Sequence, residues 1–259
     1  MAIPFPEKPD VPLKNAPLIE VVCQVRIPPI LRISKEMPVD FQEEIRHEFP
    51  NLETEQGFLF RIPKPGVDKK PEIAADNLVN RFKSIDNKTS VSLAVDFYAL
   101  STQRYTHWRE FLRQLQLLDE AVQKIYTPPY ANRIGLRFIN RLTPENTGLQ
   151  TLPEICGLVH SDLTVLNRSK VWESTQEMET RILLADGNGK LNLRTGYGTS
   201  QDNIPYFLLD FDYFEEGQLN LSNLVERCTA YHDVIYRAFR WCIPDEKLSI
   251  FNPGAEDQK

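Results

Sequence analysis

The residues best able to do chemistry lie in the stretch 131–142, ANRIGLRFINRL. Arg133, Arg137 and Arg141 recur at every fourth position, so in a β-strand their side chains share one face. Ile134, Leu136, Phe138 and Leu142 then occupy the opposite face and can seal a core. Residues on one face of a strand lie about 7 Å apart, so the arginines would recur about every 13 Å. This arginine row could track the phosphates of a nucleic acid or hold the carboxylates of a partner.

A second candidate is the pair of carboxylates in Asp210-Phe211-Asp212, which would share one face of a strand. With Asp96 or Glu179 as a third ligand, they could bind Mg²⁺ for phosphodiester cleavage. No recognisable nuclease motif frames these residues. The favoured interpretation is therefore that acids pair with the arginine row across a solvated sheet face. The acids available for such pairing are Glu20, Asp96, Glu177, Glu179, Asp210 and Asp212.

Other chemical signatures in the sequence are weak. Cys228 and His232 are four residues apart on an expected helix, a spacing that a metal can use, but no second ligand pair accompanies them. The segment 186–190, DGNGK, lacks the Ser or Thr and the helix that follow in a phosphate-binding loop, and it is typical of a hairpin turn. We therefore predict no catalytic residue, no metal site and no cofactor.

The elements that would position these residues follow from the hydrophobic pattern. Apolar residues three and four apart predict long helices over about 102–126, with Ser101 or Thr102 as the cap, and about 221–241. A shorter helix should start at Pro38, with Phe41, Ile45 and Phe49 on its apolar side. Alternating or apolar runs predict strands over 18–27, 57–62, 78–85, 89–98, 131–142, 157–166, 176–185, 190–197 and 206–214.

These elements predict an α+β fold. We expect a largely antiparallel, twisted sheet from two similar β-rich halves, with long helices packed on one face. The first half is 18–143 and the second is 154–251, joined by a linker at 144–153. Residues 1–17 contain five prolines and should form an extended arm, while 252–259 should be a disordered tail.

Composition narrows the class of protein. The 259 residues carry a formal net charge of −6, which argues against binding nucleic acid through bulk charge. No apolar run reaches the roughly 18 residues of a membrane span, and the first residues contain no apolar signal core. We therefore expect a cytoplasmic protein that does not associate with a membrane. The four cysteines form no CxxC pair and are expected to be reduced and buried.

Five segments together carry a resemblance to a known family. They are KNAPLIEVVCQVRIP (14–28), YTHWREFLRQL (105–115), RIGLRFINRL (133–142), LLDFDYF (208–214) and HDVIYRAFRWCI (232–243). The sequence resembles, over nearly its whole length, a sporadically distributed prokaryotic family of about this length that has no assigned enzymatic activity. The resemblance implies a shared fold and a bacterial or archaeal origin, and it carries over no catalytic residue. Sporadic distribution is typical of toxin–antitoxin, mobile and phage-defence genes.

The sequence therefore favours a non-enzymatic binding protein that engages a partner protein through the solvated sheet face, in a toxin–antitoxin, chaperone or phage-defence locus. Its expected binding residues are Arg133, Arg137, Arg141, Asp96, Asp210 and Asp212. One alternative is a metal-dependent nuclease using Asp96, Asp210 and Asp212, which the missing motifs disfavour. The other is an RNA- or nucleotide-binding module using the arginine row, which the low basicity disfavours. The oligomeric state is not predicted.

Overall fold

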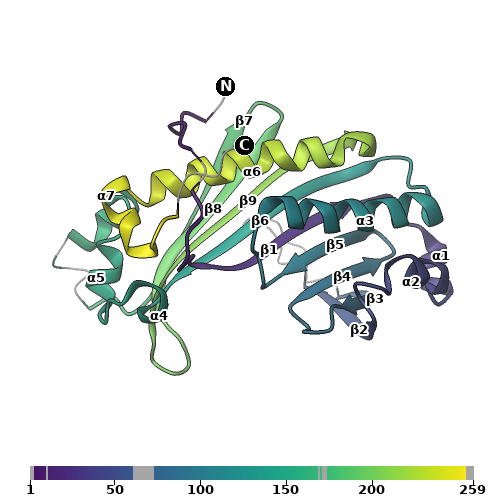
Figure 1. Ribbon diagram of the computed structural model, residues 1–259, viewed down its shortest axis with the longest axis horizontal. Coiled ribbons are helices and arrows are strands. Elements are labelled where there is room, and N and C mark those ends of the chain that lie inside the picture. Colours follow the sequence, from purple (N-terminus) through teal and green to yellow (C-terminus); the bar gives the residue numbers. More distant parts are fainter. Residues whose placement is uncertain (1–2, 10, 61–72, 169, 171–173, 255–259) are drawn as a thin grey trace. The chain divides into compact units, whose positions relative to one another are not determined.

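The computed structural model describes residues 3–9, 11–60, 73–168, 170 and 174–254. Its strands form a nine-stranded sheet in the order β2-β3-β4-β5-β1-β6-β9-β8-β7 (Figure 1). Every strand pair with a defined register is antiparallel, which confirms the α+β class and the largely antiparallel sheet. The strands are β1 Leu18–Arg26, β2 Asn51–Phe60, β3 Ile73–Lys83, β4 Thr89–Ala94, β5 Phe97–Thr102, β6 Ala131–Leu142, β7 Met178–Asp186, β8 Gly189–Thr199 and β9 Pro205–Leu219.

Two long helices, α3 and α6, stand out among the helical elements (Figure 1). None of the helices in the described part of the chain is long and apolar enough to cross a membrane. The α-helices are α1 Leu31–Lys35, α2 Val39–Ile45, α3 Trp108–Tyr126, α4 Pro144–Thr147, α5 Leu152–Cys156, α6 Leu224–Cys242 and α7 Asp245–Leu248. The 3₁₀ helices include η1 Ser161–Arg168, η3 Leu221–Asn223 and η4 Ser249–Phe251.

The chain divides into two compact units, each made of separate stretches of sequence. Unit 1 comprises Met1–Val21, Gly135–Glu216 and Glu226–Lys259, and unit 2 comprises Val22–Ile134 and Gly217–Val225. The boundaries therefore pass through β1, β6, β9 and α6. The segment 144–153, expected as a linker, holds α4 and the first turn of α5 instead.

The core of unit 2 is built by α2 and α3 against the strands β3 to β5. Phe41, Ile45 and Phe49 are fully buried, which confirms the short apolar helix expected after Pro38. The ring of Phe41 meets that of Phe82 on β3 edge-on, with centroids 5.5 Å apart. The long helix contributes the apolar stripe Phe111, Leu115, Leu118, Ala121 and Val122, all buried.

The expected start of the long helix in unit 2 is wrong. Residues 97–102 form β5, and α3 begins only at Trp108, so Ser101 and Thr102 do not cap it. Cross-strand hydroxyl pairs hold β5 to β4: Thr89 and Thr102 lie 2.9 Å apart, and so do Ser90 and Ser101. The strand expected over 89–98 accordingly ends at Ala94, where a turn at 95–96 begins.

In unit 1, α6 covers the apolar face of β6, β9 and β8 (Figure 1). Aromatic pairs join the helix to β9, with Phe211 and Phe239 centroids 6.5 Å apart and Tyr213 and Tyr231 centroids 4.7 Å apart. Each of these rings is buried. Burial of the aromatic faces between helix and sheet is the main stabilising contribution of this layer.

The hairpin predicted in unit 1 is confirmed by β7 and β8, whose turn contains Gly187 at a φ of 59°. The strand predicted over 157–166 is wrong, because 157–160 form a turn and bend and η1 begins at Ser161. A capping box between Thr151 and Glu154 starts α5, which ends at Cys156, directly before this segment. The strand predicted at 57–62 extends over Asn51–Phe60 as β2, while 61–62 lie outside the described residues.

The ends of the chain meet in unit 1. Leu13 and Pro253 form an isolated antiparallel bridge, so 252–254 are not a free tail; the remainder of that segment, 255–259, lies outside the described residues. The side chains of Cys23, Cys228 and Cys242 are buried, as expected, whereas that of Cys156 is half-buried.

Replacement of Gly196 should show how closely β7 approaches β8. A Cβ atom at this glycine would lie 2.0 Å from the carbonyl oxygen of Met178, so Gly196→Ala must push the two strands apart. We expect a loss of about 1–3 kcal/mol in the free energy of unfolding, measured by urea denaturation. Leu183→Ala on the exposed side of β7 is the control and should cost less than about 1 kcal/mol. Equal losses in the two variants would contradict the close approach.

Asp119 on α3 should make the stability depend on pH. Its carboxylate accepts a hydrogen bond of 2.6 Å from the Tyr98 hydroxyl, but burial raises its pKa above the usual value. The protonated form is therefore favoured by folding, and its contribution is lost as pH rises from the unfolded pKa near 3.8 through the folded pKa. Asp119→Asn should remove this loss, so denaturation at pH 4 and pH 7 should differ less in the variant. An unchanged pH dependence would contradict the assignment.

Candidate binding face

The arginine row lies on the polar side of β6, as the sequence predicts. Ile134, Leu136 and Leu142 are fully buried, whereas Arg133, Arg137 and Arg141 are partly exposed. The assignment of β6 residues to two faces is therefore confirmed. Gly135–Leu142 belongs to unit 1, whereas Arg133 lies in the part of β6 that belongs to unit 2.

The middle arginine is paired with an acid, also as predicted. Arg137 Nε donates to Asp210 Oδ1 and Arg137 Nη2 to Asp210 Oδ2, each over 2.7 Å. The Asp210 side chain is 2 % exposed and that of Arg137 is 38 % exposed. The hydrogen bonds to Asp210 raise the pKa of Arg137, so this guanidinium stays charged at any ordinary pH.

The pair extends across the next two strands. Arg194 lies directly opposite Asp210 in the β8–β9 register, and its Nη1 is 3.6 Å from Asp210 Oδ2. The same guanidinium reaches Glu179 Oε1 on β7, with Nη2 at 3.1 Å. We call Arg137, Asp210, Arg194 and Glu179 the charge ladder. Positive and negative groups alternate along it, so its formal charge is zero and its members stabilise one another.

Asp212, another predicted site residue, lies close to the charge ladder. Asp212 lies two residues beyond Asp210 on the same face of β9, opposite Asn192, and it is partly exposed. Its charge also raises the pKa of Arg137, after the larger effect of Asp210.

Asp96 lies in the turn between β4 and β5, in unit 2, and Asp210 and Asp212 lie in unit 1. Its expected position on the polar side of a long strand is wrong, because that strand ends at Ala94. The turn holds the chain after β1 instead: the carbonyl of Asp96 accepts from Ile27 N at 2.9 Å.

Arg141, the last residue of the row, has a different environment. Its guanidinium carbon lies 4.1 Å from the centroid of the Tyr206 ring, a cation–π contact between β6 and β9. It makes no ion pair with any residue that the structure describes. The Tyr206 ring has room because Gly198 lies opposite it, where a Cβ atom would be 3.1 Å from the Tyr206 hydroxyl.

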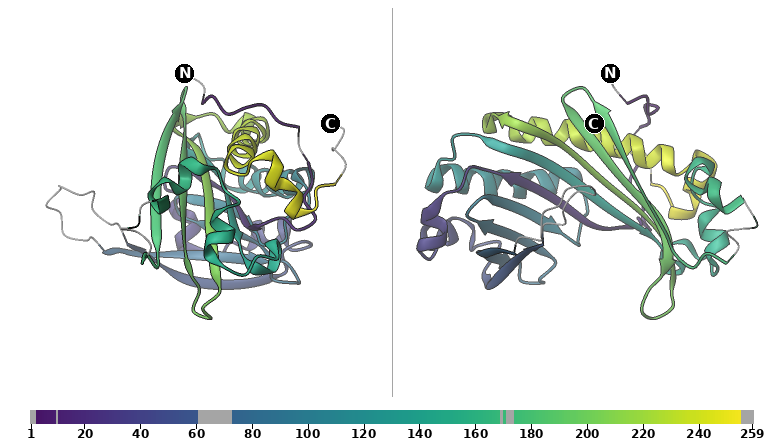
Figure 2. Two further views of the ribbon diagram at one scale, coloured as in Figure 1. Left: turned by 90° about the vertical axis from the view of Figure 1, so that its left-hand side faces the viewer. Right: turned by 180° about the vertical axis from the view of Figure 1, so that it is seen from behind.

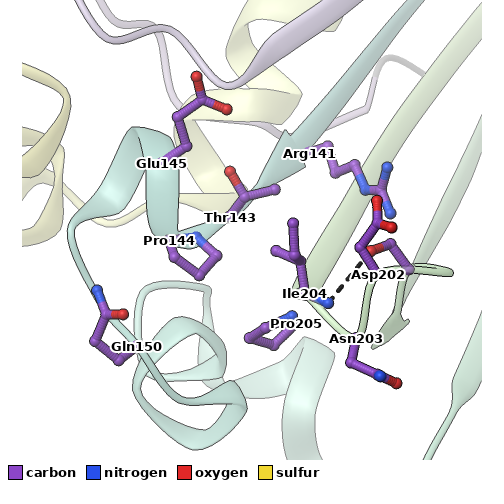
Figure 3. A pocket seen from close by; sticks show the side chains of 10 residues that line it. Arg141, Thr143, Pro144, Glu145, Gln150, Asp202, Asn203, Ile204 and Pro205 are labelled. Atoms are coloured by element: carbon purple, nitrogen blue, oxygen red, sulfur yellow. Dashed lines mark hydrogen bonds between the residues drawn. The ribbon is translucent and has the colours of Figure 1, made fainter.

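Arg141 borders a pocket of about 590 Å³ within unit 1. Its side chain points toward the turn between β8 and β9 (Figure 3). The other lining residues are Thr143, Pro144, Glu145 and Gln150 around α4, and Ser200, Asp202, Asn203, Ile204 and Pro205 from that turn.

The walls of this pocket are held by local hydrogen bonds. In the β8–β9 turn, Ser200 N donates to Ile204 O at 2.9 Å, and Ile204 N donates to Ser200 Oγ at 3.2 Å (Figure 3). On the other wall, Thr143 and Asn146 form a capping box at α4. Asn146 Nδ2 also donates to the Arg141 carbonyl at 2.8 Å, which ties β6 to α4. The pocket is therefore preformed rather than dependent on a ligand.

The charges of the lining define what the pocket can bind. Arg141 offers N–H donors that have no acceptor among the described residues and that suit a carboxylate, and Glu145 and Asp202 offer acceptors that suit a basic group. The sum of the three formal charges is −1, which disfavours a polyphosphate chain. The pocket therefore fits a ligand that combines an acidic and a basic group, such as a protein segment.

Several of these groups are not evident from the sequence. Arg194 joins the site through the β8–β9 register, and Tyr206 joins it because β6 and β9 are neighbours in the sheet. Glu145 and Asp202 join it through the folding of the segments around α4 and the turn. Their sole sequence signal is position: Tyr206 and Asp210 are four residues apart on β9, as Arg137 and Arg141 are on β6. Side chains four apart share a strand face.

Replacement of Arg137 should measure how much the charge ladder contributes to the free energy of unfolding. Arg137→Ala leaves the buried carboxylate of Asp210, among the described residues, with the longer contact to Arg194 alone. We expect a loss of about 1–3 kcal/mol in the free energy of unfolding, followed by urea denaturation. Arg141→Ala is the matched control on the same strand and face, and should cost less than about 1 kcal/mol. A negligible loss for Arg137→Ala would mean that the pair contributes no stability.

Comparisons with known proteins add no identity to this site. No protein-family model matches the chain, and no curated protein matches it either. Among the residues that the structure describes, no group of three or more His, Cys, Asp or Glu side chains is arranged to hold a metal ion. The candidate binding face therefore has to be judged from its own geometry.

Proposed function

We propose that this chain is a non-enzymatic binding protein that engages a partner protein through the polar face of β6, β9, β8 and β7. Arg141 at the preformed pocket is its main contact. The observation that carries the proposal is the contrast between Arg137 and Arg141, which lie on the same strand face. The guanidinium of Arg137 is paired with the buried carboxylate of Asp210. The guanidinium of Arg141 lies over the Tyr206 ring and has no ion-pair partner among the described residues.

Other cationic side chains of this face also have partners within the chain. Arg194 pairs with Glu179, Arg181 Nε donates to Asn192 Oδ1 at 2.7 Å, and Lys190 lies 3.1 Å from Glu216. Arg141 is thus positioned to receive a carboxylate without first breaking an internal ion pair. Stacking on Tyr206 also lowers the entropic cost of fixing its side chain in a complex.

The charge around the pocket favours a protein ligand over RNA or a nucleotide. Glu145 and Asp202 would repel successive phosphates, and the chain as a whole carries a net charge of −6. A protein segment with mixed charges meets both signs at once. The resemblance to a sporadically distributed prokaryotic family adds the proposal that this partner is encoded in a toxin–antitoxin, chaperone or phage-defence locus.

The nuclease alternative receives no support from the geometry. Both carboxylate oxygens of Asp210 accept hydrogen bonds from Arg137, so a metal ion would have to displace a guanidinium from a buried acid. Asp96 belongs to the other unit. Cleavage of nucleic acid that Asp210→Asn or Asp212→Asn abolishes would overturn the binding proposal.

We further propose that the chain arose by duplication of one β-rich unit. From its first strand outward, one part of the sheet runs β1-β5-β4-β3-β2 and the other runs β6-β9-β8-β7. In both parts short helices follow the first strand, an antiparallel meander comes next, and a helix of 19 residues ends the series. The shared order supports two similar halves despite their different strand numbers.

Affinity capture tests the proposed function. Wild type, Arg141→Ala and Arg109→Ala are immobilised as full chains, and proteins of the source organism are captured and identified. Arg109 is an exposed arginine on α3, so its replacement controls for the loss of one positive charge. The affinity of each captured protein is then measured at about 50 mM and about 500 mM salt.

We expect Arg141→Ala to weaken capture of a specific partner at least about tenfold at low salt, with a smaller loss at high salt because screening removes the Coulomb contribution. Arg109→Ala should stay within about twofold of wild type. If Arg141→Ala retained full affinity, or if both variants lost affinity equally, Arg141 would not be the contact.

A further inference from the structure

The N-terminal arm, residues 3–9 and 11–17 as described, lies against the C-terminal half of α6 within unit 1 (Figure 2). The carbonyl oxygen of Pro9 accepts two hydrogen bonds, from the Tyr236 hydroxyl at 2.8 Å and from Arg240 Nη1 at 3.1 Å. Val11 N donates to the same Tyr236 hydroxyl at 2.9 Å. The helix therefore contacts the backbone of a proline-containing segment by hydrogen bonds.

Two side chains of the arm add further contacts. The ring of Phe5 lies 5.8 Å from that of Trp241, and Lys8 forms an ion pair with Asp245 at the start of α7. The contacting residues of the segment are thus an aromatic residue, Phe5, a basic residue three positions later, Lys8, and a proline directly after it, Pro9. An extended backbone that contains prolines loses little entropy when it docks on aromatic side chains.

The side chains of α6 that contact the arm are also held in place by contacts that do not involve the arm. Arg240 is 7 % exposed, and its Nη2 donates to Asp245 Oδ1 at 2.8 Å while its Nη1 donates to the Tyr236 hydroxyl at 2.9 Å. The ring of Trp241 stacks on His160 with centroids 4.6 Å apart. His160 N in turn donates to the Cys242 carbonyl at 2.7 Å. The docking surface should therefore keep its shape when the arm leaves.

The part of the arm before residue 12 is held weakly. None of its described residues is buried. Its attachment depends on a few surface hydrogen bonds, one ring contact and one partly exposed ion pair, each a small contribution. Residues 12–15, by contrast, are anchored to 251–254 by backbone hydrogen bonds and the Leu13–Pro253 bridge. A preformed surface under a weakly held segment is the arrangement of a binding site occupied by a tethered competitor.

We propose that the surface formed by Tyr236, Arg240, Trp241 and Asp245 binds an extended proline-containing segment of a partner protein, and that the chain's own arm occupies this surface in the absence of that partner. The partner segment carries an aromatic residue four positions before the proline and a basic residue directly before it, as Phe5 and Lys8 precede Pro9. This site is separate from the polar sheet face, so either proposal can fail alone.

The test uses the full chain and a fluorescein-labelled peptide with the sequence of residues 3–13, IPFPEKPDVPL, titrated by fluorescence anisotropy. The double variant Phe5→Ala, Lys8→Ala weakens the tethered competitor but leaves the surface intact. It should bind the peptide at least about tenfold more tightly than wild type, because less of the site is occupied. Adding Tyr236→Phe to the double variant should cost at least about fivefold, since the Pro9 carbonyl and the Val11 amide lose their shared partner. Tyr130→Phe in the same background is the control and should change nothing.

Three results would overturn the proposal. The double variant could fail to bind the peptide, which would make the arm a purely structural strap. A peptide with its Phe and Lys replaced by Ala could bind equally well, which would remove the stated specificity. Wild type could form a dimer that the double variant abolishes, which would assign the surface to the arm of a second copy. Sedimentation of both proteins over a range of concentrations measures the last outcome.

Discussion

The buried carboxylate of Asp210 is the constraint on which the polar face depends. A carboxylate that is 2 % exposed costs several kcal/mol unless cations and donors surround it. Here the compensation comes from both neighbouring strands: Arg137 on β6 binds both oxygens, and Arg194 on β8 approaches from the other side. A shift of β6 by one residue would turn Arg137 into the core and leave the acid without its main partner. The ion pair therefore specifies the register as well as the charge balance.

The same constraint distinguishes the charged side chains that are paired within the sheet from Arg141, which can contact a ligand. Once Arg137 and Arg194 are committed to Asp210, the face is close to neutral along the charge ladder. Arg141, four residues beyond Arg137, extends past the buried acid and meets the ring of Tyr206 instead. The β8–β9 turn and the capping box of α4 then fix a pocket around it. A repeated residue type on one strand thus serves two purposes, and neighbouring strands decide which residue serves which.

The sequence predicted the features that depend on local pattern. Alternation assigned the two faces of β6 correctly, the acids on one face of β9 were the expected partners of arginine, and the Gly187 turn marked the β7–β8 hairpin. Helical periodicity located the ends of α3 and α6, although not the start of α3. In these cases the signal lies within about ten neighbouring residues.

Features that depend on distant pairing could not be predicted in the same way. The run 89–102 is uniformly compatible with a strand, and only the turn at 95–96, held by the backbone of Ile27 and Ile30, divides it into β4 and β5. That turn removed Asp96 from the expected acid cluster. Arg194 reaches Asp210 through the β8–β9 register, which depends on the hydrogen bonds of Ser200 within the turn. The segment 157–166, expected as a strand, instead leads from α5 through a turn into η1.

A double-mutant cycle at Arg137 and Asp210 tests the central claim most directly. The free energies of unfolding of wild type, Arg137→Ala, Asp210→Ala and the double variant are measured by urea denaturation, and the interaction energy of the two side chains is taken from the cycle. The pair should give a favourable coupling of about 1–3 kcal/mol that persists at 1 M salt, because the Asp210 carboxylate is buried and poorly accessible to ions. A coupling near zero, or one that high salt abolishes, would show that Arg137 is not committed to Asp210 and would contradict the division between the charge ladder and Arg141.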